Sequence, residues 1–144
     1  MPQQDKGKQL KSRIFPLNTL TNYKYVVVCS FYGGRLVLSR HKQRATWETQ
    51  GGHIEPGETP LDAAKRELFE EGGITDAELF PVCDYLGYDL ESQANGVVFL
   101  ARVRSIASLP ESEMAEIQMF DELPKELTYP NVTPTLMDEA AKRL

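Results

Sequence analysis

Cysteine is scarce in this chain of 144 residues, and its two copies, Cys29 and Cys83, lie in separate apolar stretches. Free cysteine is one of the residue types most often buried, so both thiols are expected in the core. Neither has His41 or His53 close to it in the sequence. The sequence therefore does not predict a zinc site built from cysteine and histidine.

Long apolar runs are absent as well. No stretch approaches the roughly 20 residues that a membrane-spanning helix needs. The polar segment 1–13 is not followed by the apolar core of a signal peptide. These absences predict a cytoplasmic protein with no membrane partner. Residues 1–13 are expected to form a loose arm of a single domain spanning 1–144, which is long enough to bury one hydrophobic core.

Positive charge is in short supply, because 16 Lys and Arg stand against 21 Asp and Glu, a formal net charge of −5. A nucleic-acid duplex demands clustered basic residues, so duplex binding is not predicted. A small anionic substrate is compatible with this charge if local cations offset the repulsion.

Strands are predicted wherever β-branched and aromatic residues gather between turn residues. These stretches are 23–32, 35–40, 78–90, 95–103 and 117–120. The first two are joined by a Gly33-Gly34 hairpin turn, since glycine tolerates the positive φ of such turns. Residues 41–50 are expected to be a polar connection.

Helices are predicted at 59–72 and 133–144. Thr59 and Thr133 are the expected N-caps, and each is followed by a proline, which suits the first helical position. The order of strands, helix, strands and helix predicts an α/β protein in which a mixed sheet lies between helices.

The first predicted helix carries an unusual acidic face. Glu67, Glu70 and Glu71 have the spacing i, i+3, i+4 and so share one side of the helix, where like charges repel. A hard divalent cation such as Mg²⁺ or Mn²⁺ would remove that repulsion, because these ions prefer oxygen ligands. The alternative is a solvated surface face, which acid-rich helices often present.

A longer pattern surrounds these glutamates. Residues 52–74 read GHIEPGETPLDAAKRELFEEGGI. This segment resembles the Nudix box of the Nudix (MutT-type) hydrolases, whose pattern is Gly, five residues, Glu, seven residues, then Arg-Glu-apolar-any-Glu-Glu-any-Gly-apolar. Every specified position is matched, from Gly52 and Glu58 to Ile74.

The resemblance implies a Nudix-type α/β/α sandwich and a metal-dependent hydrolase of phosphoanhydride bonds. It implies that Glu67, Glu70 and Glu71, with the carbonyl of Gly52, bind Mg²⁺ or Mn²⁺. Glu58 and Arg66 would form an ion pair that fixes the loop against the helix. Gln50 departs from relatives, many of which have proline before the glycine pair.

Such a hydrolase needs a general base to take a proton from the attacking water. Glu67 and Glu70 are candidates, and so is a glutamate of the stretch 110–120, which contains Glu111, Glu113 and Glu116. We favour Glu113, because Glu116 adjoins a predicted strand. The alternative is that all three are ordinary surface acids.

Residues for substrate binding are expected just before the box. Arg40 and Arg44 belong to a basic cluster that is suited to the outer phosphates of a nucleotide, unless the cluster is simply solvated. Trp47 is a candidate for stacking on a base, although a tryptophan is more often a core residue.

The stretches around the box resemble small bacterial proteins of the 8-oxo-dGTP diphosphatase type. They imply a nucleoside triphosphate pyrophosphohydrolase that prefers an oxidised purine and releases a nucleoside monophosphate and pyrophosphate. Hydrolysis of ADP-ribose or dinucleoside polyphosphates is an alternative. An isopentenyl-diphosphate isomerase is another, although such enzymes need a reactive cysteine near the site. A catalytically silent nucleotide-binding module is less favoured, because the box acids are intact. Many relatives are homodimers.

Overall fold

The computed structural model describes residues 7–144. Its strands and helices follow the chain in the order β1 (Lys11–Phe15), β2 (Tyr23–Tyr32), β3 (Arg35–His41), β4 (Trp47–Glu48), β5 (Gln50–His53), α2 (Pro60–Gly72), β6 (Asp76–Tyr88), β7 (Gln93–Ser105), β8 (Met114–Phe120) and α3 (Thr133–Ala141). No helix of the described residues is long and apolar enough to cross a membrane.

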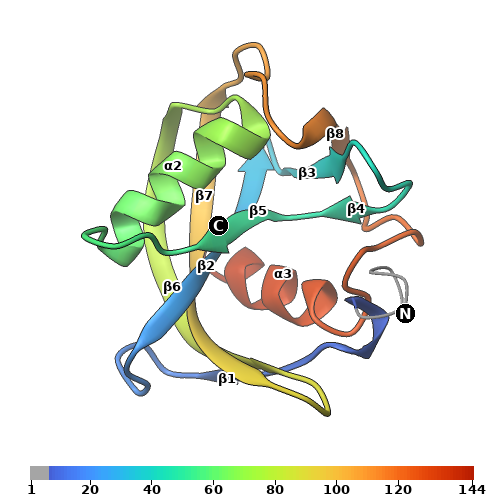
Figure 1. The fold of residues 1–144 in the computed structure, drawn as a ribbon. Coiled ribbons are helices and arrows are strands. Elements are labelled where there is room, and N and C mark those ends of the chain that lie inside the picture. Colours follow the sequence, from blue (N-terminus) through green and yellow to red (C-terminus); the bar gives the residue numbers. More distant parts are fainter. Residues whose placement is uncertain (1–6) are drawn as a thin grey trace.

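One mixed sheet forms the centre of the molecule (Figure 1). Its main path runs β1-β6-β7-β2-β3-β4, with β5 paired to β2 and β8 paired to β3. The pair β2–β7 is parallel, and the other pairs are antiparallel. The predicted α/β class with a mixed sheet is therefore confirmed.

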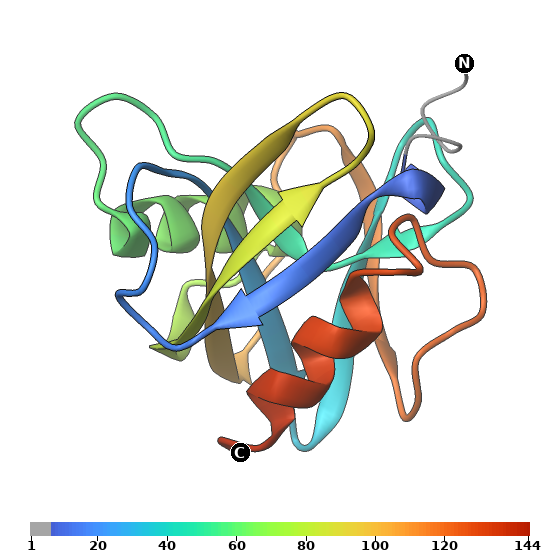
Figure 2. The ribbon, with the colours of Figure 1, turned by 90° about the horizontal axis from the view of Figure 1, so that it is seen from below.

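Helices α2 and α3 cover opposite faces of the sheet, as Figure 2 shows from below. Strand β2 alternates between these faces, because successive side chains of a strand point in opposite directions. Cys29 belongs to the core under α3, with Leu136, and Val28 belongs to the core under α2, with Leu68. Both cysteines are buried free thiols, as predicted.

Helix α2 begins and ends as predicted. The Thr59 hydroxyl accepts a hydrogen bond from the Asp62 N–H, and the Asp62 carboxylate accepts one from the Thr59 N–H, both at 3.1 Å. This capping box satisfies backbone donors at the first turn. Gly73 ends the helix in the left-handed conformation, with φ of 65°. The helix that carries the acidic face is therefore fixed at both ends.

Part of the predicted N-terminal arm is a strand. Residues 1–6 of that arm lie outside the described residues, but Lys11–Phe15 pairs along its length with β6. The strand KSRIF has a mostly polar, exposed pattern, so its side chains gave no signal. Its backbone groups pair with the outer edge of β6, and this long-range pairing determines the structure.

Two further predictions were wrong. The segment 41–50, expected to be a polar connection, contains β4 and the first residue of β5. Strand β5 pairs with β2 although its sequence QGGH has little β-propensity. Thr133 is not an N-cap: Val132 occupies that position, and the buried Thr133 donates its N–H to the Tyr129 carbonyl instead. For β5, the long-range pairing with β2 overrides local preference, whereas at Thr133 a local backbone hydrogen bond satisfies the N–H without a side-chain cap.

Candidate active site

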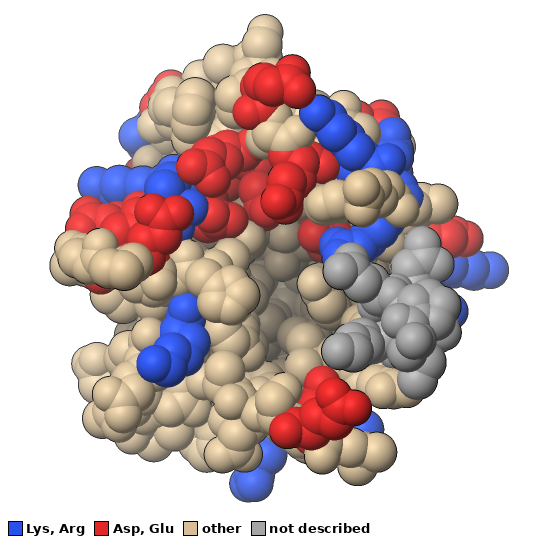
Figure 3. All heavy atoms as spheres, viewed as in Figure 1, with Lys and Arg blue, Asp and Glu red and all other residues tan. Residues whose placement is uncertain are grey.

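An acid-lined cavity of about 790 Å³ lies where α2 faces β5 and the segments around His41 and Glu113. Figure 3 shows acidic side chains gathered above a hollow in this face. We call the cavity between α2, β5 and these segments the acid cavity. The carboxylates that line it are Glu48, Glu67, Glu71 and Glu113.

Strand β5 holds two box glutamates in place. The Gly51 N–H donates a hydrogen bond of 2.9 Å to the Glu71 carboxylate. A Cβ on Gly52 would lie 2.5 Å from Glu67 Oε2, closer than van der Waals contact allows. The missing side chain of Gly52 therefore lets β5 approach helix α2 closely, and the Gly51 N–H fixes the Glu71 carboxylate at the cavity.

Gln50 anchors this strand to the core. Its buried side-chain amide accepts a hydrogen bond from the Ser30 hydroxyl at 2.7 Å and donates to the Ser39 hydroxyl at 2.9 Å and to the Val37 carbonyl at 3.2 Å. Buried polar groups are tolerated when they are bonded in this way. The amide thus ties β5 to both β2 and β3.

The carboxyl of Glu71 is unusual electrostatically. Withdrawal from water raises its pKa to about 9, and repulsion from Glu67, Glu48 and Glu113 adds to the shift. Burial likewise raises the pKa of Glu67. Carboxyl groups so placed are stabilised as anions when a cation joins them.

The donor set suits a hard cation, because carboxylate oxygens and the carbonyl of Gly52 are all oxygen ligands. As the side chains lie, no three acidic or imidazole groups within residues 7–144 are close enough to form a metal site. Glu67 and Glu71 line the cavity, whereas the half-exposed Glu70 lies 3.4 Å from Arg66 Nη1. Glu70 therefore does not line the cavity that the other two glutamates share.

Arg66 ties the loop before α2 to the helix. Its guanidinium binds Glu58 through two hydrogen bonds, of 2.7 and 3.0 Å, and donates to the His53 carbonyl at 2.9 Å. It also contacts Glu67. Paired hydrogen bonds of this kind fix orientation as well as distance.

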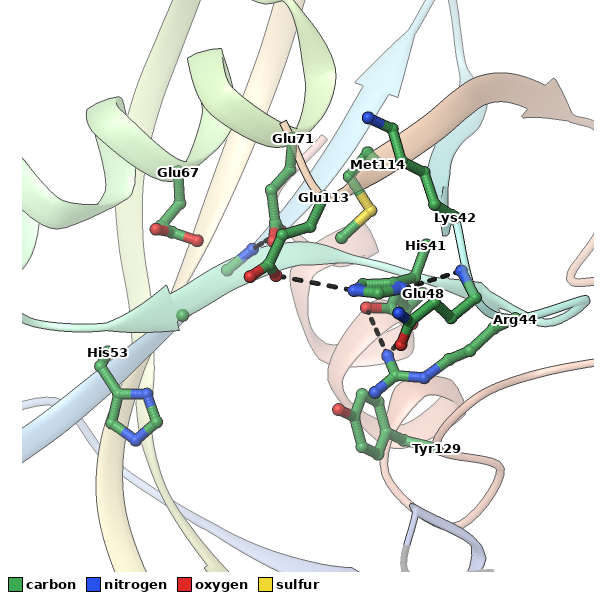
Figure 4. Close-up of a pocket in the computed structure, with 13 residues that line it drawn as sticks. His41, Lys42, Arg44, Glu48, His53, Glu67, Glu71, Glu113, Met114 and Tyr129 are labelled. Carbon is green, nitrogen blue, oxygen red and sulfur yellow. Dashed lines mark hydrogen bonds and ion pairs between the residues drawn. The ribbon is translucent and has the colours of Figure 1, made fainter. Parts of the chain in front are cut away.

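The three acids of the stretch 110–120 have different surroundings. Glu111 pairs with Lys42 at 3.0 Å, and Glu116 pairs with Arg40 at 2.8 Å. Glu113 alone of the three lines the acid cavity, where its carboxylate lies 3.6 Å from His41 Nε2 (Figure 4).

The candidate substrate-binding residues are also separated. Arg44 lines the cavity and pairs with the buried Glu48 at 3.0 Å. Arg40 and Trp47 do not line it: Arg40 turns to Glu116, and the Trp47 ring packs edge-on against Phe120 with centroids 5.1 Å apart.

A second, mainly apolar pocket of about 270 Å³ adjoins the acid cavity and shares Glu48, Gly51, Gly52, His53 and Tyr129 with it. We call it the aromatic pocket, because Tyr25, His53, Tyr85 and Tyr129 line it. Sequence reasoning missed these residues, which come from separate segments. Their one sequence signal is that His53 directly follows the glycine pair.

A family model described as the NUDIX domain matches residues 22–136, which include all of the residues that line the acid cavity. The chain belongs to the Nudix family. The predicted class, a Nudix hydrolase that acts on phosphoanhydride bonds, is confirmed by this match together with the relatives and the solved structures that follow.

Curated relatives include RNA pyrophosphohydrolases. That of Sulfurovum sp. is 32% identical over 126 residues, which cover 74% of this chain and 76% of that protein. That of Mesorhizobium japonicum is 41% identical over 59 residues, 40% of this chain and 34% of that protein. The second match thus spans only about a third of its relative.

Solved structures share the fold. A mutant pyrophosphohydrolase from Bacillus subtilis superposes with a TM-score of 0.78 at 21% identity, covering 93% of this chain and 90% of that one. An ADP-ribose pyrophosphatase from Streptococcus suis gives 0.64 at 19% identity, covering 83% and 89%. Sequence identities this low show a shared fold and do not identify the substrate.

Proposed function

We propose that this Nudix hydrolase removes pyrophosphate from the 5′-triphosphate end of RNA, by cleaving the anhydride bond between the α- and β-phosphates. The observation that carries the proposal is the junction of the acid cavity with the aromatic pocket. A terminal nucleotide has the same two parts, a charged phosphate chain and a flat base. The relatives named RNA pyrophosphohydrolase support RNA as the substrate.

The metal site of this proposal uses Glu67, Glu70, Glu71 and the carbonyl of Gly52. Mg²⁺ is the proposed ion and Mn²⁺ the alternative, because both take oxygen ligands. A bound divalent cation supplies charge neutralisation to the phosphates and makes a water molecule more acidic.

The remaining chemistry belongs to side chains of this chain. Glu113 is the proposed general base, with Glu67 and Glu70 as alternatives, because it lines the acid cavity together with Glu71 and has an exposed carboxylate. Arg44 is the proposed phosphate contact, since it lines the cavity. Glu58 and Arg66 would hold the loop before α2 in a fixed position against the helix.

The aromatic pocket is the proposed site of the base. Tyr25 packs edge-on against His53 and Tyr85, with centroid distances of 6.2 and 5.3 Å, so the rings form a connected wall. Aromatic side chains bind bases of any sequence through stacking. Recognition limited to one end of a strand also agrees with a net charge of −5.

A free nucleoside triphosphate, with 8-oxo-dGTP as the example predicted from the sequence, is the second candidate, because it has the same two parts, a phosphate chain and a base. The isomerase alternative is disfavoured. Burial raises the pKa of Cys83 to about 11 and raises that of Cys29 further, and neither thiol lines the acid cavity. A thiol with such a pKa is unreactive near neutral pH.

The test measures hydrolysis, with Mg²⁺ or Mn²⁺, of a 5′-triphosphorylated RNA oligonucleotide, dGTP, 8-oxo-dGTP, ADP-ribose and a dinucleoside tetraphosphate. Chromatography identifies the products, since only the triphosphates can release pyrophosphate. RNA is expected to give the highest kcat/KM and to leave a 5′-monophosphate. A higher kcat/KM for 8-oxo-dGTP would replace RNA with the second candidate.

Variants connect the activity to the site. Glu70→Gln and Glu71→Gln should each lower kcat by at least about 10²-fold, the scale of losing a group that acts in the transition state. Glu91→Gln, in the exposed turn between β6 and β7, is the matched control, and its kcat should equal that of the wild type.

Binding of a substrate without turnover by the wild type would favour the binding-module alternative. A cytoplasmic location and a homodimer remain predictions; light scattering tests the latter.

A further inference from the structure

His41 is held in a defined orientation beside the acid cavity. It is the last residue of β3, its side chain is mostly buried, and its Nδ1 accepts a hydrogen bond of 3.1 Å from the Gln43 N–H. A nitrogen that accepts a hydrogen bond carries no proton. The neutral ring therefore carries its proton on Nε2, the nitrogen nearer to Glu113.

Glu113 has few other contacts to orient it. Its side chain is 80% exposed, and its carboxylate lies 3.6 Å from His41 Nε2. A long, exposed side chain samples several rotamers. The contact with His41 restricts these rotamers (Figure 4).

The sheet brings the two residues together through a shift in register. Arg40 pairs with Glu116, but His41 pairs with Met114, so β8 advances by two residues while β3 advances by one. Extra residues of this kind bend a strand and redirect the side chains beside them. The shift places Glu113, which directly precedes β8, beside the end of β3.

The contact is not needed to join the two segments. The Lys42 N–H donates to the Glu113 carbonyl at 2.9 Å, and Lys42 Nζ pairs with Glu111 at 3.0 Å. These bonds already tie the start of β8 to the end of β3. What the imidazole adds is control over the direction of one carboxylate.

We infer that His41 is a positioning residue: its Nε2–H holds the Glu113 carboxylate toward the acid cavity, in the orientation from which it takes a proton from water. The inference rests on the proposed function of Glu113. His41 itself does not touch the reacting atoms. Contacts of this kind are often long in the absence of substrate and shorten in the reactive complex.

The test is a double-substitution cycle on kcat and KM, measured with both the 5′-triphosphorylated RNA oligonucleotide and 8-oxo-dGTP. His41→Phe should lower kcat roughly 10- to 100-fold with KM nearly unchanged, as expected for a misplaced catalytic group. His41→Gln, whose amide N–H replaces the donor, should recover most of that loss. In a Glu113→Gln background, His41→Phe should change kcat less than about twofold, because the oriented carboxylate is gone.

Glu111→Gln is the matched control, since it breaks the neighbouring ion pair between the same segments and should leave kcat unchanged. Melting temperatures verify that each variant folds. A long-range ¹H–¹⁵N NMR spectrum of the metal-free wild type should show the His41 proton on Nε2. Each of four results would overturn the inference. These are a His41 proton on Nδ1, the full kcat loss from His41→Phe in the Glu113→Gln background, an equal kcat loss in Glu111→Gln, and no recovery of kcat in His41→Gln.

Failure of the proposed substrate is distinguishable from failure of this inference. If the wild type cleaves only 8-oxo-dGTP, RNA is excluded as the substrate, and the ratios measured on 8-oxo-dGTP still decide the role of His41. If it cleaves no member of the substrate panel, both proposals are wrong.

Discussion

Replacing Gly52 with alanine should lower kcat strongly while lowering the free energy of unfolding only slightly. The added Cβ would lie 2.5 Å from Glu67 Oε2 and 2.8 Å from its Cδ, against the 3.4 Å at which ordinary contact begins. The Glu67 carboxylate must therefore move by roughly 0.9 Å. Displacing a group in an active site by about 1 Å costs on the order of 10²-fold in rate. The free energy of unfolding should fall by only about 1 kcal/mol, because the end of a side chain moves more easily than backbone.

The neighbouring glycine provides the comparison. A Cβ on Gly51 would lie 2.4 Å from the Val26 carbonyl oxygen, which belongs to the backbone of β2. Gly51→Ala should therefore destabilise the fold by about 3 kcal/mol or more. Urea unfolding and kcat, measured on both variants, separate the two effects. If Gly52→Ala kept a kcat within about twofold of the wild type, the close approach of Glu67 to β5 would not matter for the reaction.

Two further substitutions test other contacts. Hydrogen bonds from Arg66 lower the pKa of Glu58 to about 2, so this ion pair adds stability above the unfolded pKa of about 4.5 and loses it as the pH falls through about 2. In Arg66→Lys, which cannot form both bonds, a carboxyl NMR titration should place the Glu58 midpoint higher; an unchanged midpoint would contradict the assignment. Trp47→Ala should lower the free energy of unfolding by about 2 kcal/mol through the lost Phe120 contact, with KM unchanged. A marked rise in KM would instead support stacking on the base.

Helix α2 was predictable because its signals are local. The cap at Thr59, the terminating glycine at Gly73 and the acidic face all depend on residues within one stretch of chain. The Nudix pattern could likewise be recognised from spacing alone. Helical spacing also indicated that Glu67 and Glu71 would face the same side.

The rest of the site depends on register and on distant segments. Arg40 and Arg44 look equivalent in the sequence, but Arg40 lies in a paired strand that directs it to Glu116, whereas Arg44 lies in the following loop. The sequence favoured Glu113, but its position beside His41 depends on a register shift that no sequence pattern marks. Tyr129 reaches the cavity from the segment before α3. Such placements follow from the assembled sheet.

Strand β1 protects the molecule from self-association through the edge of its sheet. Its residues Lys11–Phe15 occupy the backbone hydrogen-bonding groups along one side of β6. An uncovered strand edge is a template for another chain, and charged side chains on the covering strand discourage such pairing. Lys11 and Arg13 give β1 that charge. A chain shortened by its first 15 residues should therefore associate with itself in light-scattering measurements, so this plain, polar strand acts as a guard against aggregation.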